Sequence, residues 1–130
     1  MIFIVGGAYQ GKRKYAALKY NISEKVILNG SVCDIDDVYN AVCISEYHEL
    51  VKRLICSGIS PEKFTNDLIE KNKNAVIIMN EIGCGIVPID RKEREWREAA
   101  GRCGCIIASG SETVIRIVCG MPHEIKGETD

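Results

Sequence analysis

Short apolar runs separated by longer amphipathic stretches form the dominant pattern along this chain. Several of the runs are unbroken rather than alternating, which is typical of parallel strands covered on both faces. The pattern predicts five strands, at Ile2–Val5, Val26–Leu28, Ala41–Ile44, Ala75–Met79 and Val114–Cys119.

The amphipathic stretches between these runs predict helices. One helix is expected from Gly11 to about Tyr20, and another follows Ser60-Pro61, a capping residue with a first-turn proline. A helix capped by Ser45 is expected to end near Gly58, with an apolar stripe formed by Tyr47, Leu50, Val51, Leu54 and Ile55.

The stretch 90–108 predicts the longest helix. Its beginning is strongly charged, and pairs such as Glu93 and Arg97 stand four residues apart, as on a solvated helix face. The apolar side consists of Trp96, Ala99, Ala100, Cys103 and Ile107.

Alternating strands and helices predict an α/β fold in which a mainly parallel sheet of about five strands is flanked by helices. A chain of 130 residues fits one compact domain, and no linker or repeat divides it. We therefore expect a single domain over 1–130, with 127–130 forming a frayed tail.

Charge and cysteine content exclude several classes of function. Seventeen basic residues balance eighteen acidic ones, so no net field favours nucleic acid or an anionic membrane. No apolar run could span a bilayer and the apolar opening is too short for a signal peptide, so we expect a cytoplasmic protein. Seven cysteines, an odd number without a C-x-x-C pair, predict neither a disulfide framework nor a metal site. Most of them stand among Val, Ile and Ala, where a thiol behaves as a small hydrophobe.

A glycine-rich loop provides the strongest chemical signal. Gly6-x-x-x-x-Gly11-Lys12 directly follows the first strand and precedes the first helix, the context in which backbone amides and a helix N-terminus hold phosphates. It predicts a P-loop-type domain that binds ATP or GTP, with Lys12 as a catalytic residue; the alternative is a tight turn with an exposed lysine. The predicted nucleotide-binding residues are Gly6, Gly7, Ala8, Tyr9, Gln10, Gly11, Lys12, Arg13, Lys14 and Asn80.

The residue after Lys12 departs from the usual loop motif. A Ser or Thr hydroxyl normally ligates magnesium at this position, whereas this chain has Arg13. A guanidinium cannot ligate a cation but can clamp phosphate oxygens. The sequence therefore predicts phosphate binding while leaving metal-assisted transfer in question.

A second signature ends the fourth predicted strand, where Asn80-Glu81 precedes a glycine-rich turn. A carboxylate at this edge, beside the phosphate loop, would accept a proton from an attacking hydroxyl or orient magnesium. We therefore name Glu81 as the second catalytic candidate. Pairing of Glu81 with an arginine or a helix N-terminus is an equally good interpretation.

Taken together, these motifs resemble the adenosylcobinamide kinase / adenosylcobinamide-phosphate guanylyltransferase family of cobalamin synthesis. The resemblance covers about half of the chain. It is carried by Gly6–Ala8 with Gly11-Lys12, by Asn80–Pro88, by Arg94–Arg102, and by Val118–Pro122 with Lys126.

The resemblance implies an enzyme that phosphorylates the hydroxyl of adenosylcobinamide with ATP or GTP. A histidine then takes GMP from GTP and passes it to that phosphate. It also implies a homo-oligomer, typically a trimer. This chain lacks a histidine in 29–40, where the family carries the guanylylated one, and His48 lies off the apolar stripe of its predicted helix. We expect His48 to face solvent rather than act as a nucleophile.

Two other interpretations stay open. A degenerate relative would bind nucleotide or corrinoid without turnover, which Arg13 and the missing histidine favour, whereas the intact Asn80–Pro88 block favours an active enzyme. A redox or metal protein that uses its cysteines lacks support from their spacing.

Overall fold

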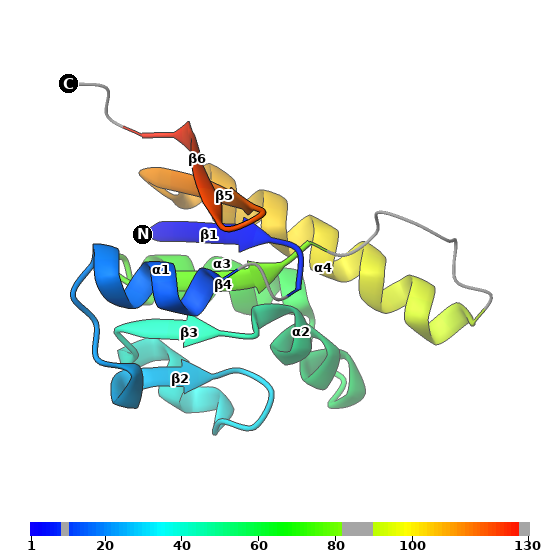
Figure 1. Ribbon diagram of the computed structural model, residues 1–130. Coiled ribbons are helices and arrows are strands. Elements are labelled where there is room, and N and C mark those ends of the chain that lie inside the picture. Colours follow the sequence, from blue (N-terminus) through cyan, green and yellow to red (C-terminus); the bar gives the residue numbers. More distant parts are fainter. Residues whose placement is uncertain (9–10, 82–89, 128–130) are drawn as a thin grey trace.

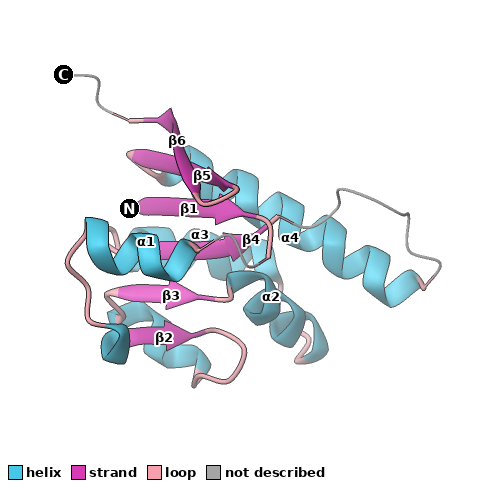
Figure 2. Ribbon diagram, in the orientation of Figure 1, coloured by secondary structure: helices cyan, strands magenta, loops and turns pink. Residues whose placement is uncertain are grey.

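A six-stranded sheet with helices on both faces forms the framework of the protein in the computed structural model, which describes residues 1–8, 11–81 and 90–127 (Figures 1 and 2). The strands are β1 (Ile2–Gly6), β2 (Ile27–Asn29), β3 (Cys43–Ser45), β4 (Val76–Asn80), β5 (Thr113–Val118) and β6 (Met121–Lys126). Their order is β2-β3-β4-β1-β5-β6. The first five pair in parallel, and β6 is antiparallel to β5. The mainly parallel α/β fold expected from the sequence is confirmed.

The helices cover the two faces unequally. The elements are α1 (Lys12–Lys19), α2 (Tyr47–Cys56), α3 (Pro61–Lys71) and α4 (Arg91–Gly110), with short 3-10 helices η1 (Glu24–Val26) and η2 (Ile35–Asn40). Helix α1 packs on one face through Ala16, next to Ile4 and Ile78 of the central strands. Helices α2, α3 and α4 pack together on the opposite face.

Strict alternation along the central strands separates the two hydrophobic cores. Phe3 and Ile77 point to the face that α2, α3 and α4 cover, whereas Ile4 and Ile78 point to the face of α1. Val76, Ile77, Ile78 and Met79 are all buried, as expected for a parallel strand covered on both sides. The unbroken apolar runs thus indicated the strands correctly.

The hairpin that adds β6 was not predicted. Cys119 was assigned to the fifth strand, but it forms the tight turn with Gly120, and both residues have positive φ, at 51° and 75°. Such a turn matches the twist of an antiparallel pair. Every residue of β6 is exposed, so this edge strand lacks the apolar pattern by which strands are predicted.

Two of the predicted helix ends are confirmed and one is wrong. Ser60 accepts a hydrogen bond from the Lys63 amide at the start of α3, and Gly58 has a φ of 73° just beyond α2. Ser45, however, lies in β3, and its hydroxyl donates to the Leu28 carbonyl instead of capping α2. Glu46 occupies the N-cap position, with left-handed backbone angles.

Three of the cysteines are more exposed than their sequence neighbours suggested. Cys33, Cys43 and Cys103 are buried among apolar side chains, whereas Cys56, Cys105 and Cys119 reach the surface. Each of these six is a free thiol. Among the helices that the structure describes, none has the length and apolar character required to cross a bilayer.

Candidate functional site

The loop between β1 and α1 lies at the carboxyl edge of the parallel sheet. Gly6 ends β1 beside Asn80 of β4, and a Cβ at Gly6 would lie 2.5 Å from the Ile117 carbonyl oxygen of β5. Gly11 precedes α1 with a φ of 81°, a conformation that glycine adopts without strain. Tyr9 and Gln10 are outside the described residues.

Lys12 is the first residue of α1 and is only 7% exposed. Its Nζ donates a hydrogen bond to the Gly7 carbonyl oxygen at 2.6 Å, so the ammonium reaches back across the loop. Burial lowers the pKa of Lys12, and the carboxylates of Glu46 and Glu81 act in the opposite direction. The alternative of an exposed lysine is therefore wrong: the loop holds a desolvated cation.

A pocket of about 320 Å³ opens beside this ammonium. It contains three cationic side chains from the first turn of α1 and one carboxylate, so its charge suits an anion. The described lining residues are Ala8, Gly11, Lys12, Arg13, Lys14, Glu46, Ile78 and Asn80. Six of these were predicted from the sequence, while Glu46 and Ile78 were not.

Glu81 lies just beyond β4, with its amide donating to the Gly6 carbonyl oxygen at 2.8 Å. Its carboxylate pairs with Arg116 of β5: Nε donates to Oε1 at 2.6 Å and a terminal nitrogen donates to Oε2 at 3.0 Å. This pair bridges the strands on either side of β1. Of the interpretations of Glu81 offered by the sequence, pairing with an arginine is the one that matches this geometry. Gly83 and Gly85, which the sequence assigns to a glycine-rich turn, lie outside the described part of the chain.

His48 is buried, contrary to the expectation that it faces solvent. Only 4% of it is exposed, and its Nδ1 accepts a hydrogen bond from the Asn80 amide at 3.1 Å. Its carbonyl oxygen accepts a hydrogen bond from the Trp96 indole of α4 at 2.7 Å. The contact with β4, which no helical periodicity reveals, explains the error.

Glu46 is the residue of the pocket that the sequence interpretation missed. It directly follows β3, and its Oε2 lies 3.1 Å from His48 Nε2. A signal was available, because a carboxylate just beyond a buried parallel strand is the same feature that singled out Glu81.

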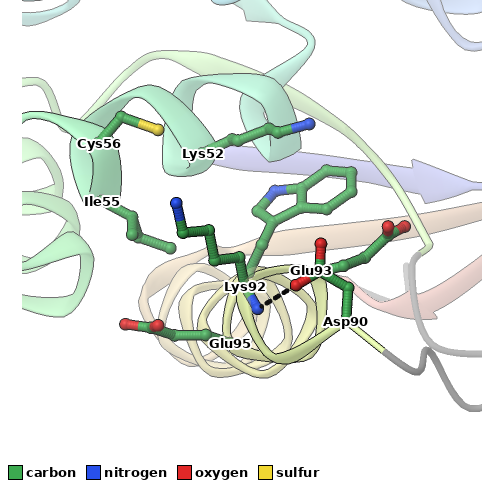
Figure 3. Close-up of a pocket in the computed structure, with 8 residues that line it drawn as sticks. Lys52, Ile55, Cys56, Asp90, Lys92, Glu93 and Glu95 are labelled. Atoms are coloured by element: carbon green, nitrogen blue, oxygen red, sulfur yellow. Dashed lines mark hydrogen bonds between the residues drawn. The ribbon is translucent and has the colours of Figure 1, made fainter.

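A larger pocket of about 630 Å³ lies between α2 and α4 (Figure 3). Lys52 stands over the Trp96 ring there, with its Nζ 4.8 Å from the ring centroid. Three carboxylates oppose two lysines in its lining, so the charge is unfavourable for a phosphate chain. We therefore place the candidate site at the loop rather than in this pocket.

The fold and the site define an α/β protein with a glycine- and lysine-containing loop at the carboxyl edge of its central strands. A family model described as cobinamide kinase / cobinamide phosphate guanyltransferase matches residues 44–125, which is more than half of the chain. The chain belongs to this family, which confirms the resemblance.

Two curated relatives are both bifunctional adenosylcobalamin biosynthesis proteins, CobU, one from Salmonella typhimurium strain LT2 and one from Escherichia coli strain K12. Each is 39% identical over 51 residues, which are 39% of this chain and 28% of the relative. The alignment thus spans under a third of either relative. The family match begins after the glycine-rich loop, so the loop is identified from its own residues and geometry.

The buried imidazole predicts a pH-dependent stability. Burial lowers the pKa of His48 from its ordinary value of 6.5, and Lys12 acts in the same direction, against Glu46 and Glu49. Between pH 6.5 and the lower pKa of the folded state, His48 is therefore protonated in the unfolded chain but not in the folded chain. The free energy of unfolding therefore falls as the pH is lowered through that window, with a slope of at most about 1.4 kcal/mol per pH unit.

Urea unfolding of the wild type and of His48→Gln between pH 5 and 8 measures this contribution. The variant has no imidazole that titrates at position 48. The difference in unfolding free energy between wild type and variant should therefore change below pH 6.5 and stay constant above it. A difference independent of pH would contradict the assignment.

Proposed function

We propose that this protein is a nucleotide-binding enzyme of cobalamin biosynthesis that transfers a phosphoryl group from ATP or GTP to the hydroxyl of adenosylcobinamide. The observation that supports it most is the buried Lys12 ammonium at the mouth of a cationic pocket. Membership of the cobinamide kinase family is the reason for proposing a corrinoid substrate.

The pocket's own residues would bind the phosphates in the following way. The N-terminus of α1 carries partial positive charge, and the Lys12 ammonium would exchange the Gly7 carbonyl for a phosphate oxygen. Arg13 and Lys14 are exposed at the pocket and would neutralise further charge. Catalysis of phosphoryl transfer consists mostly of such positioning and charge stabilisation.

Magnesium does not fit the loop as a protein-bound ion. The hydroxyl that would ligate it is replaced by the guanidinium of Arg13, which repels a cation. Magnesium would enter as part of the nucleotide substrate.

We do not propose guanylyl transfer through His48. The lone pair of His48 Nδ1 is used by the Asn80 amide, so the proton of the neutral ring lies on Nε2. Neither nitrogen then offers a free lone pair to an incoming phosphate. Assembly into a homo-oligomer stays a prediction from the resemblance.

A second candidate function is nucleotide or corrinoid binding without turnover. Arg13 favours it, because an active loop normally supplies a hydroxyl at that position. The two candidates share the phosphate site and differ only in whether transfer follows.

Replacing Lys12 tests the site that both candidates share. A charge-assisted hydrogen bond contributes about 1.5–3 kcal/mol, so Lys12→Ala should weaken GTP or ATP binding by about 10- to 100-fold in calorimetric titration. Lys19→Ala, at the exposed far end of the same helix, is the matched control and should change the affinity less than about twofold. Equal affinities for wild type and Lys12→Ala would place the nucleotide elsewhere.

Turnover separates the two candidates. Wild-type protein incubated with magnesium, GTP or ATP, and adenosylcobinamide should yield phosphorylated corrinoid, detectable by mass spectrometry. Arg13→Ser restores the missing hydroxyl and should raise that rate. Nucleotide binding without product in either protein would exclude the kinase and leave the binding protein.

A further inference from the structure

The carboxylate of Glu46 lies in the cationic pocket although it weakens the pocket's affinity for anions. Strand β3 runs parallel to β4 and β1, so Glu46 emerges at the same edge of the sheet as Asn80 and the glycine-rich loop. It lines the pocket together with Lys12, and its charge opposes the lowering of the Lys12 pKa by burial. A carboxylate so placed opposes phosphate binding, and its presence therefore points to the chemistry that follows binding.

The backbone at Glu46 is strained and firmly held. Its φ of 54° and ψ of 42° are left-handed, a conformation that is unfavourable for a residue with a side chain. Its carbonyl oxygen accepts from the amides of Glu49 and Leu50, and the preceding Ser45 carbonyl accepts from the Gly30 amide. Glu46 does not use its side chain to cap α2. Strain of this kind accumulates where a side chain must point in one direction.

His48 fixes the direction of that side chain. The Asn80 amide donates to Nδ1, which leaves the ring proton on Nε2, and Nε2 lies 3.1 Å from Glu46 Oε2. The imidazole is itself buried, and the backbone carbonyl oxygen of His48 accepts a hydrogen bond from the Trp96 indole. One Glu46 oxygen thus lies beside a buried donor, while 39% of the Glu46 side chain stays exposed and the residue lines the pocket.

We propose that Glu46 is the proton acceptor for the attacking hydroxyl and that His48 is its positioning residue. The inference rests on the proposed phosphoryl transfer. The hydroxyl oxygen forms a bond to the γ-phosphorus while the bond from that phosphorus to the bridging β,γ-oxygen breaks. The nucleoside diphosphate leaves with the electron pair, and the hydroxyl proton passes to the Glu46 carboxylate. Glu81, whose two oxygens already accept from Arg116, serves to bridge β4 and β5.

Charge-neutral substitution of the carboxylate separates binding from turnover. Glu46→Gln should lower kcat for corrinoid phosphorylation at least about 100-fold, as for loss of a general base. The same variant should bind GTP as tightly as wild type or more tightly, because a repulsive charge is gone. Glu49→Gln in the first turn of α2 is the matched control, and Glu81→Gln should retain more turnover than Glu46→Gln.

Two replacements of His48 test its positioning role. The amide of a glutamine reaches the position of Nε2 and can donate to Glu46. The amide of an asparagine reaches only the position of Nδ1, where it can accept from the Asn80 amide. His48→Gln should therefore keep a kcat about 10- to 100-fold above that of His48→Asn, with similar KM for nucleotide. A merely structural role would give both variants the same kcat, or would favour asparagine. Thermal unfolding of every variant identifies losses caused by misfolding.

The outcomes separate this inference from the proposed function. Absence of nucleotide binding by the wild type would refute the proposed function and the inference together. Binding without phosphoryl transfer would refute the proposed phosphoryl transfer together with the role of Glu46, and would leave the nucleotide site intact. With an active wild type, the inference is overturned if Glu46→Gln keeps its turnover, if it loses affinity and turnover in parallel, or if Glu81→Gln is the more damaging change.

Discussion

The hydrogen bond between the Lys12 ammonium and the Gly7 carbonyl determines the character of the whole site. A buried ammonium is costly unless it has a partner, and the loop supplies one from its own backbone. The loop's own backbone therefore holds the cation at the carboxyl edge of the sheet. In the proposed nucleotide complex a phosphate oxygen would take the place of this carbonyl oxygen, and much of the cost of desolvating the lysine would already have been met by folding.

The parallel sheet explains why the rest of the site gathers around that cation. Strands β3, β4 and β1 are neighbours that end at one edge, which places Glu46, Asn80 and the loop together although they are far apart in the sequence. His48 then ties two of these strand ends to each other, through the Asn80 amide and Glu46. The site thus depends on strand order more than on any local motif. Trp96, which lines the larger pocket between α2 and α4, donates a hydrogen bond to the His48 carbonyl oxygen.

Local patterns predicted the framework well because its strands are buried on both faces and its helices carry clear apolar stripes. Strand β6 was missed because all of its residues are exposed, so its sequence carries no apolar pattern. His48 and Glu46 were misjudged for a different reason. Helical periodicity describes which side of α2 meets the core, but His48 lies at the first turn, where the end of β4 covers it. Likewise, the partner of Glu81 follows from the register of β5 against β1, which no spacing within either segment contains.

Nucleotide binding at the Lys12 loop is the central claim, and a crystal structure of the protein with GTP or a non-hydrolysable analogue tests it most directly. We expect the triphosphate in the pocket lined by Lys12, Arg13 and Asn80, with the Lys12 Nζ moved from the Gly7 carbonyl to a phosphate oxygen. A nucleotide bound elsewhere, or a Lys12 still bonded to Gly7 beside an unligated loop, would contradict it.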